Sequence, residues 1–443
     1  MTTSYRFRCG WSFYIKTSLW LALSFSTACF WLFHTKVALH NPMFVEHDEY
    51  VGIIQFGTKD KAEDSRVENF STTVPKATIA YAVSLTGCGE SDGHGHSELD
   101  YVGLYDGSAV LKHSVHLNSF RYNSSRSKYD YKMVVFVHPS AISCSAPFEA
   151  IGYEIQVRDT PINVSEIQGE FLKTNVVKSG CCGEKEYIKL YSYTLMEYPL
   201  VVHLDMDSVL FQPLDELFDA ILDPSTRHAI NKPTHIRSPL PSDNTTIQAM
   251  FTRDYLMVNV GKKDVGVQGG FFIVRPNTTV FKEYQAIILE GNFIPGIGWA
   301  AKYGGYFGAQ QIQGLMAYYY DGLYPGQAVE LDYCTYNNMG HYPYDTQRRA
   351  CLGPNCKDCR IVDFATVRLG HFTKCPKPWS CKYQYHKNEV CYQMTREWFR
   401  LRRDMDSNIT TCTSNNFHLD QFHGCCERHG FTGYLALAID SKT

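Results

Sequence analysis

Two aspartates stand directly after an apolar run near the middle of the 443-residue chain. Asp205 and Asp207 follow the sequence PLVVHL at residues 199–204, which predicts a buried β-strand. Ligands of open α/β sheets bind beyond the carboxyl ends of the strands, so the two carboxylates could hold one hard cation there. Such a cation can neutralise a diphosphate. Aspartates are also common in turns after strands, and the pair alone favours that simpler interpretation.

The segments around this pair predict the sheet that would position it. Strands alternating with helices at this spacing indicate an α/β sheet. The Pro-, Ser- and Thr-rich stretch at 225–244 is expected to be an exposed loop. Buried strands are predicted at 77–85, 132–138 and 267–274, with a short one beginning at 153, and helices at 106–120, 184–196, 214–222 and 279–289.

Several sequence motifs recur in the order and spacing of one enzyme family. Before and after the aspartate pair stand KLYSYTLMEY (189–198) and DELF (215–218), and further along come VQGGFF (267–272), IQGL (312–315) and HFTKCPKPW (371–379). Together these motifs resemble glycosyltransferase family 8, the family of glycogenin. The resemblance covers about residues 77–383. It implies the GT-A fold, an α/β domain with a mixed, mostly parallel central sheet.

The resemblance also implies roles for individual residues. Asp205, Asp207 and His371 would hold a divalent cation, for which a mixed set of carboxylate and imidazole ligands suits Mn²⁺. Lys377 would pair with the diphosphate of the donor, and Gln313 would face the anomeric carbon. The catalytic set is thus Gln313, Lys377 and Asp207, and the donor-binding set is Leu85, Thr86, Lys189, Asp205, Met206, Gln268, Gly269, Gln313, His371 and Lys377.

Three positions depart from the family's pattern. Gln268 replaces the family's asparagine at a sugar-contacting position. Ile312 stands where the family usually has an aspartate, and Lys374 stands where a glycine lets the backbone approach the diphosphate. A disulfide between Cys375 and Cys381 is one way to close that loop instead. These departures bear on the donor sugar and on the fine geometry of the loop.

The expected activity is that of a retaining glycosyltransferase that moves a hexose from a UDP-sugar to a glycan, protein or lipid. Because the Gln313 amide is a poor nucleophile, front-face displacement is expected rather than a covalent intermediate. Two alternatives stay open. One is a catalytically inactive protein that binds sugar-nucleotides or glycans, and the other is a nucleotidyltransferase.

Cysteines and glycosylation motifs indicate an oxidising compartment. The chain has 16 cysteines, many of them closely spaced after residue 80, and this density favours disulfides. Cys356 and Cys359 have the C-x-x-C spacing of a zinc site, but no second pair follows at zinc-finger spacing. The N-x-[ST] motif occurs at Asn69, Asn123, Asn163, Asn244, Asn277 and Asn408.

The amino terminus predicts a membrane anchor. Residues 17–33 carry no charge and follow Arg6, Arg8 and Lys16, which favours a single-pass type II protein with its bulk in the lumen. A cleaved signal peptide is the alternative. The expected organisation is a cytoplasmic tail (1–16), a transmembrane signal-anchor (17–35), a stem (36–75), the GT-A domain (76–383) and a cysteine-rich extension (384–443). The Golgi membrane is the expected location, with the endoplasmic reticulum as the alternative.

The overall charge excludes one large class of functions. With 42 basic and 45 acidic residues, the formal net charge is −3. Such a chain has no basic field to attract a polyanion. Nucleic acid is therefore not an expected partner.

Overall fold

The computed structural model describes residues 74–88, 98–255, 265–341, 357–382, 389–405, 424–427 and 433–437. The predicted tail, membrane anchor and nearly all of the predicted stem lie outside these residues. Among the helices within them, none combines the length and the apolarity that crossing a membrane requires.

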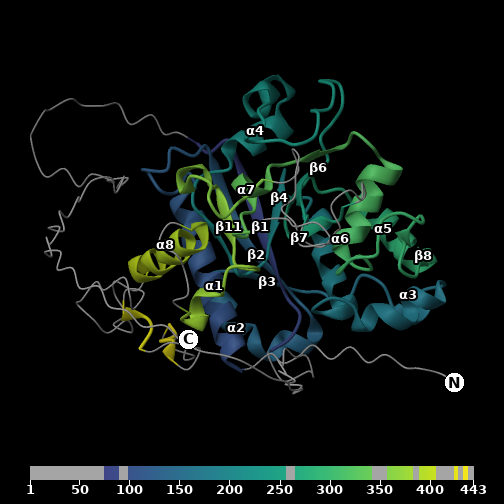
Figure 1. Cartoon of the computed structure of the whole chain (residues 1–443), viewed down its shortest axis with the longest axis horizontal. Helices are drawn as coiled ribbons and strands as arrows, with labels where there is room; N and C mark the ends of the chain where they lie inside the picture. The colour runs from purple at the N-terminus through teal and green to yellow at the C-terminus, as the bar shows by residue number, and fades with distance from the viewer. Residues whose placement is uncertain are drawn as a thin grey trace, which may run out of the picture. The chain divides into compact units, whose positions relative to one another are not determined.

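A seven-stranded sheet forms the centre of the described domain (Figure 1). All neighbouring strands are parallel except that β7 runs antiparallel to both β4 and β6. The expectation of a mixed, mostly parallel sheet is confirmed. In spatial order the strands are β10 (Ala328–Glu330), β6 (Ala249–Arg253), β7 (Val267–Val274), β4 (Val201–Leu204), β1 (Ala77–Leu85), β2 (Tyr129–Val137) and β3 (Glu154–Val157).

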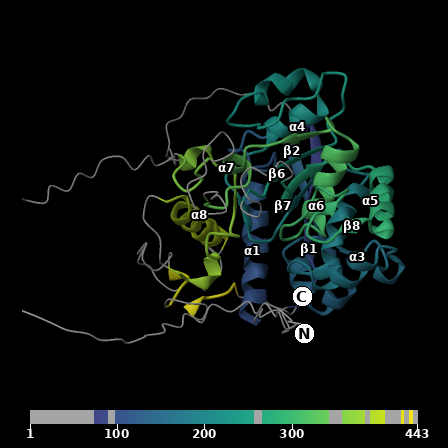
Figure 2. The same cartoon turned by 45° about the vertical axis from the view of Figure 1, so that its right-hand side comes forward.

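Helices cover both faces of this sheet, as the turned view also shows (Figure 2). Side chains alternate along β1, so Ile79 and Tyr81 enter one core cluster and Ala80 and Ala82 enter the other. The first cluster contains side chains of α1 (Glu98–Leu117), α2 (Ala146–Ala150) and α4 (Asp215–Leu222). The second contains side chains of α3 (Glu170–Asn175), α5 (Thr278–Glu290) and α6 (Ile312–Ala317).

One predicted helix has a different geometry. The segment expected as a helix at 184–196 forms a 3₁₀ helix, η4 (Gly183–Thr194), with tighter turns than an α-helix. Its residues Tyr187 and Leu190, together with Leu195 just after it, nevertheless enter the second core cluster, and Tyr191 packs against that cluster partly buried. The loop expected at 225–244 contains a further 3₁₀ helix, η5 (Pro224–Ile230).

Two short antiparallel pairs complete the strands. One is β8 (Phe293–Ile294) with β9 (Gly298–Trp299), and the other is β5 (Ser208–Leu210) with β11 (Leu369–His371). The short helix α7 (Tyr333–Tyr336) precedes Asn337. The β5–β11 pair joins segments about 160 residues apart and, as shown below, builds the site.

Disulfides attach the carboxyl-terminal part to the sheet domain. Helix α8 (Val390–Met405) is linked by Cys375–Cys391, and Cys381 pairs with Cys426. The suggested Cys375–Cys381 bridge is therefore wrong, because each of these cysteines faces a partner in the extension. Cys359 pairs with Cys334, so Cys359 is not a ligand in the zinc site considered for Cys356 and Cys359. A fourth bridge joins Cys88 to Cys144.

Candidate metal centre

The pairing of β5 with β11 brings His371 to the aspartate pair. Ser208, the first residue of β5, lies opposite His371 in the antiparallel register. The backbone N–H of Phe372 donates to the carbonyl oxygen of Asp207, at 2.9 Å. Asp205 is held from the other side, because its N–H donates to the carbonyl oxygen of Gly270 in β7 at 3.0 Å. Thus three strands fix the three predicted ligands.

The side chains of Asp205, Asp207 and His371 offer one ligand atom each, and these atoms lie within 4.8 Å of one another. His371 Nε2 is 3.3 Å from Asp207 Oδ1 and 3.7 Å from Asp205 Oδ2. Gly270 leaves room for this approach, since an added Cβ would stand 2.5 Å from both Asp205 Oδ2 and His371 Cε1. Two carboxylates and one imidazole are a donor set that fits Mn²⁺ or a similar divalent ion.

A chain of hydrogen bonds sets the tautomer of His371. The backbone N–H of Gly270 can only donate, so the atom of Gln268 that lies 2.7 Å from it is Oε1. Asn337 Nδ2 then donates to the same oxygen at 3.1 Å and to Thr252 Oγ1 at 2.9 Å. Asn337 Oδ1 therefore faces His371 Nδ1, at 3.2 Å, and accepts its proton. Nε2 therefore carries the lone pair. Thr373 Oγ1 lies 3.1 Å from Nε2, and a bound cation would take the place of that hydroxyl.

Electrostatics keep the ligands in their metal-binding forms. Burial of the imidazole, which is fully inaccessible, lowers the pKa of His371 and favours the neutral ring. Burial opposes ionisation of Asp205, but the nearby Lys189 ammonium is the largest opposing influence, and the pKa of that carboxyl lies below its usual range. An ionised carboxylate beside a neutral imidazole is the state that binds a cation.

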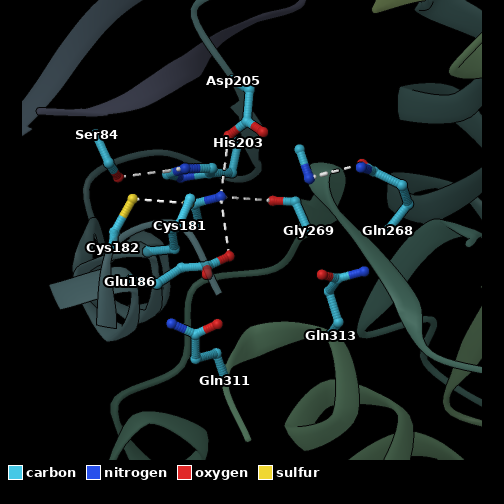
Figure 3. A network of polar contacts seen from close by, with 12 residues as sticks. Ser84, Cys181, Cys182, Glu186, His203, Asp205, Gln268, Gly269, Gln311 and Gln313 are labelled. Carbon is cyan, nitrogen blue, oxygen red and sulfur yellow. Dashed lines mark hydrogen bonds and ion pairs between the residues drawn. The ribbon is translucent and has the colours of Figure 1, made fainter. Parts of the chain in front are cut away.

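Lys189 of η4 contacts three residues that Figure 3 labels, Asp205, Gly269 and Glu186. Its Nζ donates to Asp205 Oδ1 at 2.9 Å, to the Gly269 carbonyl oxygen at 3.1 Å and to Glu186 Oε1 at 3.3 Å. Burial alone would lower the pKa of Lys189, yet Asp205 and Glu186 raise it above its usual value. The ammonium is thus a fixed positive charge beside the candidate metal ligands.

Lys377 contacts Asp207 Oδ2 and supplies a second positive charge. Its position is fixed by the buried Trp379, two residues later, which packs on two glycines of α1. A Cβ at Gly103 would overlap the indole ring, and one at Gly107 would lie 3.0 Å from it. Because Lys377 and a bound cation would share the Asp207 carboxylate, the ammonium is adjacent to any diphosphate held by that cation.

Gln313 lies on the β7 side of the site, near the start of α6. Its Nε2 donates to Asp254 Oδ2 at 3.2 Å, and both side chains are buried. A Cβ at Gly269 would contact Gln313 Cγ at 3.4 Å and Glu186 Oε1 at 3.2 Å, so Gln313 borders the same group of residues. The Asp254 charge also raises the pKa of His371 against the larger effect of burial.

Three further residues predicted to contact the donor differ in their exposure. The side chain of Leu85 is buried in the core, which leaves only its backbone for a ligand. Thr86 follows β1 and is partly exposed, and its carbonyl oxygen accepts from Ser140 Oγ at 3.2 Å. Met206 is buried between the two aspartates.

The structure thus brings Asp205, Asp207, His371, Lys189 and Lys377 together, with Gln268, Gly269 and Gln313 around them. Sequence analysis missed Asn337, Asp254 and Glu186. Asp254 directly follows β6, but the sequence of that strand (AMFTR) ends in Thr and Arg and does not form an apolar run that would have pointed to this aspartate. Asn337 has no distinguishing feature in the sequence either.

No protein-family model matches the chain, and no curated protein matches it. Among solved structures, glycosyltransferases match the chain with low scores. The WbbM bifunctional glycosyltransferase has a TM-score of 0.38 and 14% identity over 73% of this chain, which spans 50% of the WbbM chain. Mouse xyloside xylosyltransferase 1 has a TM-score of 0.38 and 13% identity, over 68% of this chain and 99% of its own. The galactosyltransferase LgtC with donor and acceptor sugar analogues has a TM-score of 0.34 and 12% identity, over 74% of this chain and 95% of the LgtC chain.

Proposed function

We propose that the chain is a metal-dependent retaining glycosyltransferase of the GT-A type, similar to family 8, that uses a UDP-sugar donor. One observation carries the proposal: Asp205, Asp207 and His371 converge within 4.8 Å beyond a strand end of an α/β sheet. Lys189 and Lys377 contact the same two carboxylates. A cation held by these three side chains, with two ammonium groups beside it, would complement the negative charge of a nucleoside diphosphate.

Asp205, Asp207 and His371 would hold Mn²⁺, which would supply Lewis-acid stabilisation of the diphosphate when bound. Lys377 then donates to a diphosphate oxygen and stabilises the charge that develops on the departing nucleotide. Lys189, already held by Asp205 and Glu186, orients the donor at the β7 side of the centre.

Gln313 and Asp254 act together on the sugar. Donation from Gln313 Nε2 to Asp254 fixes the amide, so that its dipole is preorganised toward the donor. Ile312 is completely buried in the core and cannot contact a sugar, whereas Asp254 provides a carboxylate beside Gln313. We infer that Asp254 takes the sugar-orienting role that the family's aspartate would have at position 312.

Transfer then proceeds by front-face displacement with retention of configuration. The acceptor hydroxyl attacks the anomeric carbon on the side from which the diphosphate leaves, and its proton passes to the departing diphosphate. Gln313 is an amide and forms no stable ester with the sugar. The acceptor is proposed to be a glycan, protein or lipid.

The proposed setting is the lumen of the Golgi, reached through a type II membrane anchor within residues 17–35. The four disulfides between described residues support an oxidising compartment. The uncharged segment at 17–33 and the six N-x-[ST] motifs support entry into the secretory pathway.

Incubation of the full chain with Mn²⁺ and a panel of UDP- and GDP-sugars tests the proposal. Nucleoside diphosphate is expected to be released, and Asp207→Asn is expected to abolish its release. Asp223→Asn is a matched control, because Asp223 caps η5 away from the site. Tight UDP binding without turnover would favour an inactive binding protein, and release of pyrophosphate would favour a nucleotidyltransferase.

A further inference from the structure

Two adjacent cysteines lie beside the candidate metal centre. Cys181 and Cys182 stand just before η4, and their sulfur atoms are 2.8 Å apart. Every other cysteine in the described part of the chain is in a disulfide. Cys181 is exposed and Cys182 is partly exposed, so a small thiol reagent can reach them.

The backbone around the pair is shaped by two glycines. Gly180 and Gly183 both have φ of 61°, the left-handed region in which other residues are strained. A Cβ at Gly180 would overlap the Gln311 side chain, and one at Gly183 would lie 2.7 Å from the Val177 carbonyl oxygen. The loop is therefore a tight, specifically shaped turn that carries the two thiols.

This turn is connected to both sides of the candidate site. Gln311 is fully buried and donates from Nε2 to the carbonyl oxygens of Ser179, at 3.0 Å, and Gly183. Gln311 precedes Gln313 by two residues. On the other side, Gly183 opens η4, which carries Lys189 and also Glu186, labelled in Figure 3. A change in the turn thus acts directly on the elements that hold Lys189 and Gln313.

We propose that Cys181 and Cys182 form a redox switch, closing to a vicinal disulfide that fixes the turn and strengthens binding of the nucleotide-sugar. The effect on donor binding rests on the proposed function, whereas the formation of the bond does not. Closing the ring would restrict the turn that opens η4, the helix whose Lys189 contacts Asp205 in this structure.

The oxidation is a thiol–disulfide exchange with a small disulfide such as oxidised glutathione. One cysteine thiolate attacks the small disulfide, and a mixed disulfide forms while one small thiol leaves. The neighbouring cysteine thiolate then attacks the mixed disulfide and expels the second small thiol. Two electrons pass from the cysteine pair to the small disulfide, and the two cysteine protons end on the two small thiols.

A bond between neighbours is easier to reduce than the other bridges. Adjacent Cα atoms are about 3.8 Å apart across a trans peptide, while unstrained disulfides usually span roughly 4.4–6.8 Å. The Cα atoms of the four bridges in which both cysteines are described are 5.0–5.9 Å apart. Strained and exposed disulfides have more oxidising potentials and are the labile ones. A mild reductant can therefore open this bond first.

Peptide mapping of the full chain tests the bond. Trypsin cuts after Lys178 and Lys185, which releases residues 179–185 (SGCCGEK) with these two cysteines and no other. After equilibration in oxidised glutathione and blocking of free thiols, the peptide is expected to be unblocked and two hydrogen atoms lighter than the dithiol. Recovery of the peptide with two blocking groups, while the other bridges stay intact, would overturn the proposal.

Mn²⁺-dependent UDP binding, measured by calorimetry across a glutathione series, tests the switch. The wild-type chain is expected to lose affinity several-fold on mild reduction. The Cys181→Ser, Cys182→Ser double variant should show the weaker affinity throughout, and because it keeps the other bridges it controls for their reduction. Equal affinity of the oxidised and reduced wild type would overturn the switch. If UDP binds in neither state, the proposed function fails, and the peptide map still decides whether the bond forms.

Discussion

His371 Nδ1 lies 3.2 Å from Asn337 Oδ1, and this contact directs the Nε2 lone pair of the imidazole toward Asp205 and Asp207. Asn337 is itself oriented by Gln268, whose Oε1 accepts from a backbone N–H of β7. The sheet therefore determines which imidazole nitrogen can bind a metal. Two buried amides make this connection without contacting the proposed ion.

Asn337→Leu is expected to weaken Mn²⁺ binding by roughly 10- to 100-fold, as loss of a hydrogen bond to a metal-binding histidine typically does. Asn337→Asp keeps an oxygen acceptor for the Nδ1 proton and should retain more affinity than the leucine variant. Calorimetric titration of Mn²⁺ measures both. Equal weakening by leucine and aspartate, at equal melting temperatures, would show that the acceptor does not matter.

Lys377→Met should separate metal binding from nucleotide binding. The ammonium contacts Asp207, so its loss removes a competitor and should leave Mn²⁺ affinity unchanged or tighter. UDP affinity should fall about tenfold or more, because a hydrogen bond to a charged group contributes about 1.5–3 kcal/mol. Lys232→Met, at an exposed lysine in a loop, is the control. Parallel loss of both affinities would argue that Lys377 only supports the loop.

The proposed metal ligands and the residue that orients one of them could be predicted from sequence to different degrees. Asp205 and Asp207 follow from an apolar run that ends in two carboxylates, which is a local pattern. His371 was predicted only from the motif that it opens, because its approach to Asp207 depends on the non-local pairing of β5 with β11. Asn337 follows a four-residue helix, and no periodicity in the sequence distinguishes it from other buried amides.

The disulfide partners could not be predicted for the same reason. Cys375 and Cys381 are close in sequence, yet each bonds to a cysteine beyond residue 390 because α8 packs against α1. The buried contact of Arg402 with Asp106 joins the same two helices. Local spacing carries no information about that packing. The boundary predicted at residue 384 stays a prediction, and the chain beyond it contributes Trp398 and Phe399 to a core cluster shared with Trp379.

Removal of the Cys375–Cys391 bridge should destabilise the domain. Its cysteines are 16 residues apart, and a loop of that length corresponds to a stabilisation of about 3 kcal/mol. The Cys375→Ser, Cys391→Ser variant should therefore unfold at a lower denaturant concentration under non-reducing conditions. Under strong reduction the variant and the wild type should converge. A midpoint equal to that of the non-reduced wild type would contradict the bridge.

His203 should make stability depend on pH. Burial, helped by the charge of Lys189, lowers the pKa of this histidine to about 3, while its value in the unfolded chain is about 6.5. Between these values the unfolded chain binds more protons than the folded chain. The free energy of unfolding should therefore decrease as pH falls below about 6.5, and His203 should have no effect above it.

Unfolding of His203→Gln across this pH range provides the measurement. In the variant, the slope of unfolding free energy against pH should decrease by the equivalent of up to one proton. His341, whose pKa burial also lowers to about 3, should keep its own contribution to that slope. Glutamine can still bond with Ser192, which lies 3.0 Å from Nδ1 in the wild type. An unchanged slope would mean that His203 is not held neutral.

The central claim is that Asp205, Asp207 and His371 together bind one divalent cation. Electron spin-echo spectroscopy of Mn²⁺ bound to the full chain tests it most directly, because it detects a coordinated imidazole nitrogen. The account predicts one bound Mn²⁺ with a nitrogen coupling that disappears in His371→Gln, and no bound Mn²⁺ in Asp207→Asn. A Mn²⁺ spectrum without nitrogen coupling, identical in the wild type and in His371→Gln, would contradict it.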